Sequence, residues 1–159
     1  MTSAPTSAPW AQTAFLPHID LLLQSMRISR ERLCSRSKVA INTRLLRTLL
    51  HALAGQLPFD PDFYLAQNDD VAAAYETGEI TDLRRHFIES GFIEGRFGAP
   101  PEVDETFYAD TYKDIGAAIR RGDILSATEH YVRAGAAEGR IPCEAMRPEV
   151  QRWAAALSD

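Results

Sequence analysis

The chain has 159 residues, of which 45% are hydrophobic and 25% charged, values typical of an ordinary globular protein. No apolar run approaches the roughly 20 residues that a membrane-spanning helix requires, and the first residues lack the basic and apolar regions of a cleaved secretory signal. We therefore expect no transmembrane segment, and a chain that is cytoplasmic or exported without a cleaved signal peptide. Cys34 and Cys143 match no metal motif, so we expect free thiols, no metal site and no cofactor.

The net charge of −5 conceals two parts of opposite sign. Residues 1–57 hold seven basic and two acidic side chains, whereas residues 58–141 hold eight basic and seventeen acidic ones. A basic segment of this kind is typical of chains that bind an acidic partner such as nucleic acid, a phospholipid surface or an acidic polymer. It can equally dock on the acidic part of its own chain, or present its arginines to solvent on a helix face. The sequence leaves these alternatives open.

Residues 1–17, rich in Ser, Thr, Ala and Pro, predict a disordered or draped arm, and residues 18–57 predict a basic, leucine-rich helical hairpin. In the second half of the hairpin apolar side chains recur at helical spacing, until Gly55 and Pro58 end the pattern. An apolar stripe of this length needs a cover, either the rest of the chain or another copy of it. The predicted partner interface consists of Ile41, Leu45, Leu49 and Leu53 with the neighbouring Arg44 and Arg47.

An internal repeat follows. Residues 60–96 realign on residues 104–140 at a constant offset of 44, without a gap and with thirteen identities. The identical pairs are Asp60/Asp104, Phe63/Phe107, Tyr64/Tyr108, Asp70/Asp114, Ala73/Ala117, Ala74/Ala118, Gly78/Gly122, Ile80/Ile124, His86/His130, Gly91/Gly135, Glu94/Glu138, Gly95/Gly139 and Arg96/Arg140. A unit copied whole, with its caps and core positions, is a packing unit that we expect to stack on its neighbour.

Each copy predicts three short helices, the first of which begins at an aspartate N-cap. The third helix is expected over residues 81–90 and 126–134, closed by Gly91 and Gly135 in the left-handed conformation. No segment alternates apolar and polar residues as a strand does.

The predicted fold class is therefore all-α. We expect an N-terminal helical hairpin, two stacked three-helix repeats over residues 58–100 and 101–143, and a C-terminal helix of about residues 148–157 within segment 144–159.

The first copy reads F-Y-L-x-x-N-x-D-V-A-A-A from Phe63, followed by G, H-F and G-x-x-E-G-R, and the second copy keeps much of this pattern. It resembles a short helical repeat found in tandem in bacterial proteins. That repeat accompanies surface-polysaccharide glycosyltransferases, rhamnan-synthesis-like proteins and secreted calcium-binding repeat proteins. The second copy departs from the pattern at Ala109, Tyr112 and Gly116, and the first has Asp69 where the family usually has Pro. The resemblance implies a bacterial accessory module without assigned catalysis.

The repeated polar residues are the candidates for binding or chemistry. They are His86, Glu94 and Arg96 in the first copy and His130, Glu138 and Arg140 in the second. A His–Glu pair can act as general acid and base, but no nucleophile, phosphate loop or paired carboxylate accompanies it. The alternative is structural: the imidazole packs against the aromatic pair and donates to a backbone carbonyl, and Arg96 pairs with Asp60 or Asp70. We expect the two histidines in equivalent, largely buried places. We therefore assign no catalytic residue.

The adjacent aromatic pairs allow two interpretations. Side chains of consecutive helical residues point roughly 100° apart, so one ring can be buried while the other reaches the surface. In the first, Phe63 and Phe107 lie in the core and Tyr64 and Tyr108 at the surface, where a ring beside Arg and Glu can stack on a sugar. In the alternative, both rings are buried and the tyrosine hydroxyl is bonded locally.

These observations favour a non-enzymatic binding or structural module of a bacterial surface-glycan or extracellular assembly. Its expected partners are a protein or another copy of the chain, and a polysaccharide as a further option. The first alternative is a nucleic-acid-binding protein that uses the basic N-terminal helices, and the second is a small enzyme with a His/Glu site. Salt-sensitive retention on DNA would favour the first alternative, whereas polysaccharide retention that resists moderate salt would favour glycan binding.

Overall fold

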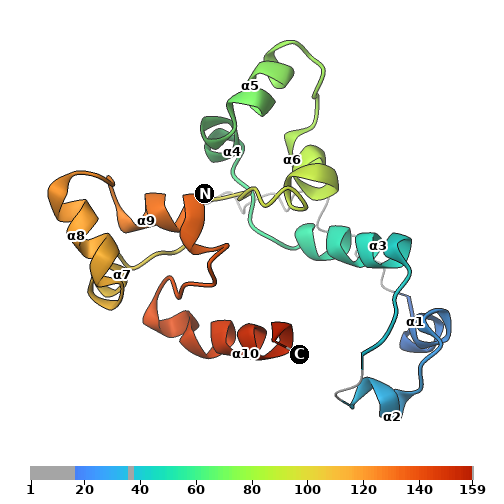
Figure 1. Cartoon of the computed structure of the whole chain (residues 1–159). Coiled ribbons are helices and arrows are strands. Elements are labelled where there is room, and N and C mark those ends of the chain that lie inside the picture. The colour runs from blue at the N-terminus through green and yellow to red at the C-terminus, as the bar shows by residue number, and fades with distance from the viewer. Residues whose placement is uncertain (1–16, 36–37, 159) are drawn as a thin grey trace, which may run out of the picture.

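The computed structural model describes residues 17–35 and 38–158, and every regular element among them is a helix (Figure 1). The predicted all-α class is confirmed, and the two described ranges contain no strand. The arm predicted for residues 1–17 lies almost entirely outside them. None of the described helices has the length and the apolar content needed to cross a membrane.

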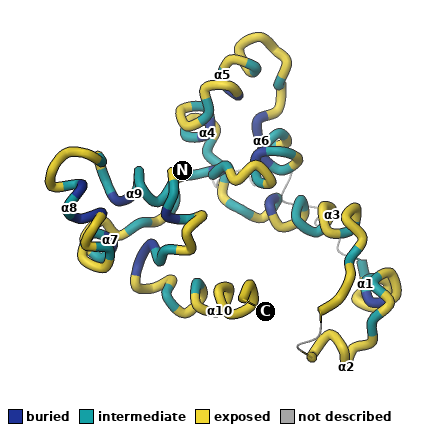
Figure 2. Tube along the Cα trace, in the orientation of Figure 1, coloured by how far each residue is buried: buried dark blue, intermediate teal, exposed yellow. Residues whose placement is uncertain are grey.

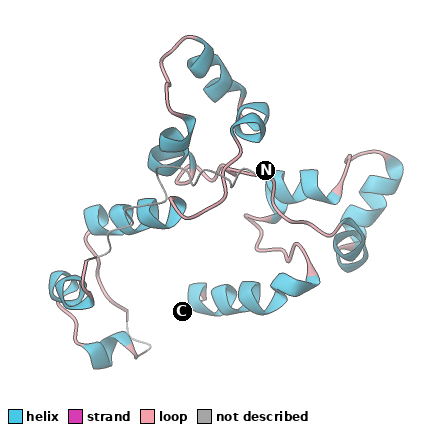
Figure 3. Ribbon diagram, turned by 180° about the vertical axis from the view of Figure 1, so that it is seen from behind, coloured by secondary structure: helices cyan, strands magenta, loops and turns pink. Residues whose placement is uncertain are grey.

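The basic N-terminal segment contains α1 (Ile19–Met26), α2 (Arg30–Leu33) and α3 (Thr43–Ala54). Helix α1 lies beyond the N-terminal end of α3 and does not run along it (Figures 1 and 3), so the segment does not form the predicted hairpin. The cause is local, because the chain turns twice. Arg27 ends α1 in the left-handed conformation, and Asn42 starts α3 by accepting a hydrogen bond from the backbone of its first turn.

The two repeats have matched helices. Repeat 1 comprises α4 (Pro61–Gln67), α5 (Asp69–Glu76), α6 (Leu83–His86) and the π-helical segment Phe87–Gly91. Repeat 2 comprises α7 (Glu105–Thr111), α8 (Lys113–Arg121), α9 (Ala127–His130) and the π-helical segment Tyr131–Gly135. Every element of repeat 2 begins 44 residues after its counterpart, so the two copies have the same order of elements. The π-helical ends were not predicted.

Each repeat closes on itself. The backbone N–H of Asp60 donates to the carbonyl of Gly98 at 2.8 Å, and that of Asp104 donates to the carbonyl of Pro142 at 3.1 Å. The buried core consists of Tyr64, Val71, Leu83 and Phe87 in repeat 1 and of Tyr108, Ile115 and Ala127 in repeat 2 (Figure 2). The described residues thus form two separate cores instead of the continuous core that stacked repeats would share.

The glycines that adopt positive φ are not the ones predicted. Positive values occur at Gly78, Gly95, Gly122 and Gly139. Gly91 and Gly135 are absent from this set because they lie inside the π-helical segments, where the backbone is right-handed. Their predicted role as left-handed caps is therefore wrong, and their identity needs another explanation.

Arg84 connects the N-terminal segment to repeat 1. Its guanidinium donates to the carbonyls of Gly55 at 2.8 Å and Leu57 at 2.9 Å, just beyond the end of α3, and lies 5.4 Å from the ring centroid of Phe59. Partial burial lowers the pKa of Arg84. Helix α3 also packs against the π-helical segment of repeat 1, so repeat 1 provides part of the cover that the apolar stripe requires.

The chain ends in α10 (Arg147–Leu157), within one residue of the predicted helix, after a 3₁₀ turn at Glu144–Met146. No residue of α10 is buried, and Trp153 is 53% exposed (Figure 2). Cys34 is exposed and Cys143 is buried, and both thiols are free.

Candidate functional site

The repeated tyrosine and histidine bind each other inside each repeat. The Tyr64 hydroxyl lies 3.0 Å from Nδ1 of His86. The same distance separates the Tyr108 hydroxyl from Nδ1 of His130. Both tyrosines are fully buried, whereas both histidines are half-buried. The histidines are therefore in equivalent places, as predicted, but they are less buried than predicted.

The burial of Tyr64 and Tyr108 overturns their predicted role as sugar-stacking residues. It is the tyrosine of each aromatic pair that enters the core, while Phe63 and Phe107 remain half-buried. The physical reason is the histidine, because a buried hydroxyl needs a hydrogen-bond partner and the imidazole supplies one.

Burial also raises the pKa of Tyr64 and Tyr108 to about 12. At neutral pH each tyrosine hydroxyl keeps its proton and shares a hydrogen bond with Nδ1 of its histidine. Nδ1 of each histidine is thus occupied by the hydrogen bond to the tyrosine hydroxyl. Because of this bond, Nδ1 is not available to take a proton from a substrate.

The glycine five residues after each histidine makes room for the tyrosine hydroxyl. An ideal Cβ on Gly91 would lie 2.2 Å from the hydroxyl oxygen of Tyr64, and one on Gly135 would lie 2.2 Å from that of Tyr108. These distances are far below van der Waals contact, so any side chain at either position must displace the tyrosine. The shared Tyr, His and Gly identities are thus explained by packing.

Arg96 joins the end of repeat 1 to the start of α5. Its Nη1 and Nη2 donate to the two carboxylate oxygens of Asp70 at 2.7 Å each, and Nη1 also donates to Oδ1 of Asn68 at 2.9 Å. Its Nε donates to Glu94 at 2.7 Å. The hydrogen bond from Arg96 holds the pKa of Asp70 at about 2, well below its usual range. Of the two partners that the sequence left open for Arg96, the structure selects Asp70.

Arg140 makes a looser version of this contact in repeat 2. Its Nη2 lies 3.6 Å from Asp114, and its Nε donates to Glu138 at 2.6 Å. Its guanidinium lies 4.7 Å from the ring centroid of Tyr112. The difference follows from one substitution, because Tyr112 stands where repeat 1 has Asn68. An aromatic face attracts the arginine by stacking, whereas an amide oxygen accepts its hydrogen bond.

The polar residues predicted to bind or react are thus engaged within their own repeats. Each histidine contacts a tyrosine, and each glutamate accepts from an arginine that also faces an aspartate. Over residues 17–35 and 38–158, no three His, Cys, Asp or Glu side chains gather closely enough to hold a metal ion. The arrangement supports a structural role for these residues and directs attention to the surface.

An apolar groove of about 710 Å³ lies between the two repeats. Its lining includes Leu57, Phe92, Phe97, Tyr131, Ala137 and Met146, together with residues 98–101. The ring of Phe97 lies 6.1 Å from that of Tyr131, so aromatic side chains from the spacer and from repeat 2 meet there. Arg96 and Glu102 are the charged residues of the lining. A hollow of this size and composition is typical of a binding site.

Of the groove residues, the sequence analysis named only Arg96 as a candidate for binding, and it did not predict the groove. The available signal was the spacer F-G-A-P-P-E-V at 97–103, which separates the two copies and carries no charge before Glu102. Its adjacent prolines, Pro100 and Pro101, favour an extended backbone without helical packing. Residues 97–102 of this spacer line the groove between the two repeats.

The predicted partner interface on α3 is only partly covered. Arg44 and Arg47 are exposed, Leu53 is 48% exposed, and Ile41, Leu45 and Leu49 are half-buried. Repeat 1 packs against one side of the helix, at its C-terminal end, where Ala54 is fully buried. The other side of α3 remains open to solvent.

No protein-family model matches the chain, and no curated protein or solved structure matches it. The resemblance to a bacterial tandem repeat therefore rests on the residues of segment 60–140 alone.

Proposed function

We propose that the chain is a non-enzymatic binding module whose groove between the repeats takes an apolar segment of a partner protein. The observation that carries the proposal is the composition of the groove, in which Arg96 and Glu102 are the charged lining residues and aromatic, proline and alanine side chains make up most of the rest. An apolar hollow that stays open to water gains free energy when a partner covers it.

The setting that we propose is a bacterial surface-glycan or extracellular assembly, and it rests on the sequence resemblance. Within that setting, protein contacts are favoured over glycan contacts. A sugar needs several polar groups to bond its hydroxyls, and the groove offers few. The tyrosines that could have stacked on a sugar are buried. The absence of catalysis is proposed because the candidate acid and base groups are held by partners inside the repeats.

A peptide-display selection on the immobilised full chain tests the proposal. The recovered peptide is titrated by calorimetry into the native chain and into the variant Ala137→Arg. Ala137 is exposed and lines the groove, so an arginine there enters the groove without disturbing a core. We expect the dissociation constant to rise by more than about tenfold, which corresponds to about 1.4 kcal/mol.

The matched control is Ala73→Arg, because Ala73 is an exposed alanine on α5 that does not line the groove. This variant is expected to bind the peptide as the native chain does. Affinity that survives Ala137→Arg would place the partner elsewhere on the molecule. A carbohydrate array on which the chain binds glycans, with no peptide recovered, would contradict the choice of a protein partner.

A further inference from the structure

We infer that the N-terminal helices form a docking surface for an anionic phospholipid membrane. The surface, called here the basic head surface, consists of α1, α2 and α3, the described residues that adjoin these helices, and Ile93 of repeat 1. Its large aliphatic side chains are unusually accessible, with exposed fractions between 37% and 59%. They are Ile19, Leu21, Leu33, Val39, Leu46 and Leu53. Side chains of this kind gain free energy when they enter the boundary between lipid headgroups and acyl chains.

Cations without acidic partners accompany these aliphatic side chains. They are Arg27, Arg32, Lys38, Arg44 and Arg47, none of which makes an ion pair with any described residue. In the repeats, by contrast, Arg85 pairs with Glu89 and Arg133 pairs with Glu129. Arg120 of repeat 2 likewise makes no ion pair with a described residue, but most cations of this kind belong to the basic head surface. Anionic headgroups would supply the missing partners.

A hollow of about 450 Å³ on α3 brings the two kinds of side chain together. Leu46, Leu50 and Ile93 form its apolar part, and Arg44 and Arg47 lie on its border. Ile93 is 49% exposed, although it belongs to repeat 1. Two guanidinium groups beside an apolar hollow fit a lipid whose phosphate meets the arginines while its acyl chain covers the leucines.

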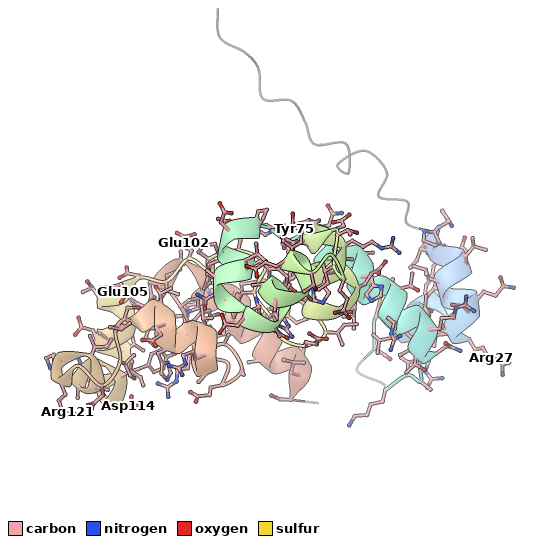
Figure 4. The ribbon with its side chains drawn as sticks, turned by 90° about the horizontal axis from the view of Figure 1, so that it is seen from above. Arg27, Tyr75, Glu102, Glu105, Asp114 and Arg121 are labelled. Atoms are coloured by element: carbon pink, nitrogen blue, oxygen red, sulfur yellow. The ribbon has the colours of Figure 1, made fainter. Side chains whose placement is uncertain are left out.

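The charge of the whole chain would orient it on such a membrane. Residues 1–57 carry seven basic and two acidic side chains, whereas residues 58–141 carry eight basic and seventeen acidic ones. Figure 4 shows Arg27 at one end of the molecule and Asp114 at the opposite end, in repeat 2. An anionic surface attracts the first end and repels the second.

Lipid fits this surface better than nucleic acid does. Residues 17–57 contain no Phe, Tyr or Trp, so the imidazoles of His18 and His51 are the aromatic rings that this segment offers to a base. The exposed apolar side chains of the basic head surface are aliphatic. The phosphate backbone of a nucleic acid has no apolar surface against which they could be buried. The combination of cations with aliphatic side chains is instead that of a protein which lies in the membrane interface.

Vesicle sedimentation of the full chain tests the inference. We expect retention on vesicles of phosphatidylcholine mixed with phosphatidylserine and little retention on phosphatidylcholine alone. Arg44→Gln with Arg47→Gln is expected to weaken retention by about 30-fold, since each cation near an anionic surface contributes about 1 kcal/mol. Leu46→Ser with Leu53→Ser is also expected to weaken it, because apolar insertion is part of the binding. Circular dichroism verifies that each variant keeps its helices.

Matched variants outside the basic head surface, in repeat 2 and α10, provide the controls. Arg120→Gln with Arg121→Gln removes the same charge, and Leu125→Ser with Leu157→Ser removes two leucines that are 86% and 80% exposed. Both controls are expected to bind as the native chain does. The inference would be overturned by absent retention, by equal retention on neutral vesicles, or by equal losses in head variants and controls. Retention of the same variants on DNA is measured in parallel. If the leucine variants bind vesicles normally while the arginine variants lose both DNA and vesicle binding, the inference is overturned in favour of nucleic acid.

Discussion

The hydroxyl oxygen of Tyr64 lies 2.2 Å from the place that a Cβ on Gly91 would occupy. The same relationship holds between Tyr108 and Gly135 in repeat 2. Each repeat thus contains a buried tyrosine whose hydroxyl is hydrogen-bonded to a histidine. The glycine leaves the space that this hydroxyl occupies. This contact explains why the tyrosine, the histidine and the glycine are identical in both copies.

Gly91→Ala should destabilise the protein by about 1 to 3 kcal/mol, because the new methyl group collides with the Tyr64 hydroxyl. Gly95→Ala should cost about 1 kcal/mol for a different reason, since Gly95 has a φ of 80° and no atom lies within 4 Å of its ideal Cβ. Denaturant unfolding of both variants measures these costs.

Addition of Tyr64→Phe to each variant separates the two causes. Loss of the hydroxyl should recover part of the stability lost in Gly91→Ala and none of that lost in Gly95→Ala. The interaction energy of the two double-mutant cycles is the relevant quantity. Equal, additive effects in both cycles would show that the hydroxyl does not select glycine at position 91.

The buried tyrosines should make the fold sensitive to alkali. Burial raises the pKa of Tyr64 and Tyr108 from 10.0 to about 12. A group whose pKa is raised by folding stabilises the native state below the unfolded pKa, and this contribution is lost as the pH rises from about 10 to about 12. Tyr64→Phe should therefore flatten the pH dependence of the unfolding free energy in this window. An unchanged slope would contradict the burial of that hydroxyl.

The Arg96–Asp70 contact should make repeat 1 sensitive to acid. Folding lowers the pKa of Asp70 from 3.8 to about 2, chiefly through the hydrogen bond from Arg96. A lowered pKa stabilises the native state above the unfolded pKa of 3.8, and this contribution is lost as the pH falls towards 2. Asp70→Asn should lower stability at neutral pH and flatten its dependence on pH between these values.

Asp114→Asn is the matched comparison in repeat 2, and it should have the smaller effect. Arg140 lies 3.6 Å from Asp114 and stacks on Tyr112, whereas Arg96 holds Asp70 by two hydrogen bonds of 2.7 Å. Unfolding free energies of both variants at neutral and acidic pH provide the measurement. A larger loss in Asp114→Asn would reverse the order that the distances predict.

Much of the fold could be predicted from the sequence because its signals are local. The gapless offset placed matching helices in both copies, and Asp60 and Asp104 cap the first helices as their positions indicate. The prediction for Gly91 failed because a glycine at the end of a helical pattern usually marks a left-handed turn. The reason for this glycine is a tertiary contact with Tyr64, which lies 27 residues earlier: any side chain at position 91 would collide with the tyrosine hydroxyl.

The candidate site could not be predicted in the same way. The choice of Tyr64 over Phe63 for the core depends on a hydrogen bond to His86, which lies 22 residues further along the chain. The groove depends on the position of one repeat relative to the other, which the spacer at 97–103 sets. The residue pattern within either copy carries no information about that position. The N-terminal segment broke at Arg27, a residue with no sequence signal for a left-handed backbone.

The central claim is that a partner occupies the groove between the repeats, and the methionine methyl groups test it most directly. The chain has three methionines. Met146 lines the groove and Met26 lies in α1, so labelled methyl signals report on the two places separately. Titration with a peptide selected on the full chain should shift the Met146 signal in step with binding and leave the Met26 signal in place. Saturated binding with an unchanged Met146 signal would contradict the account.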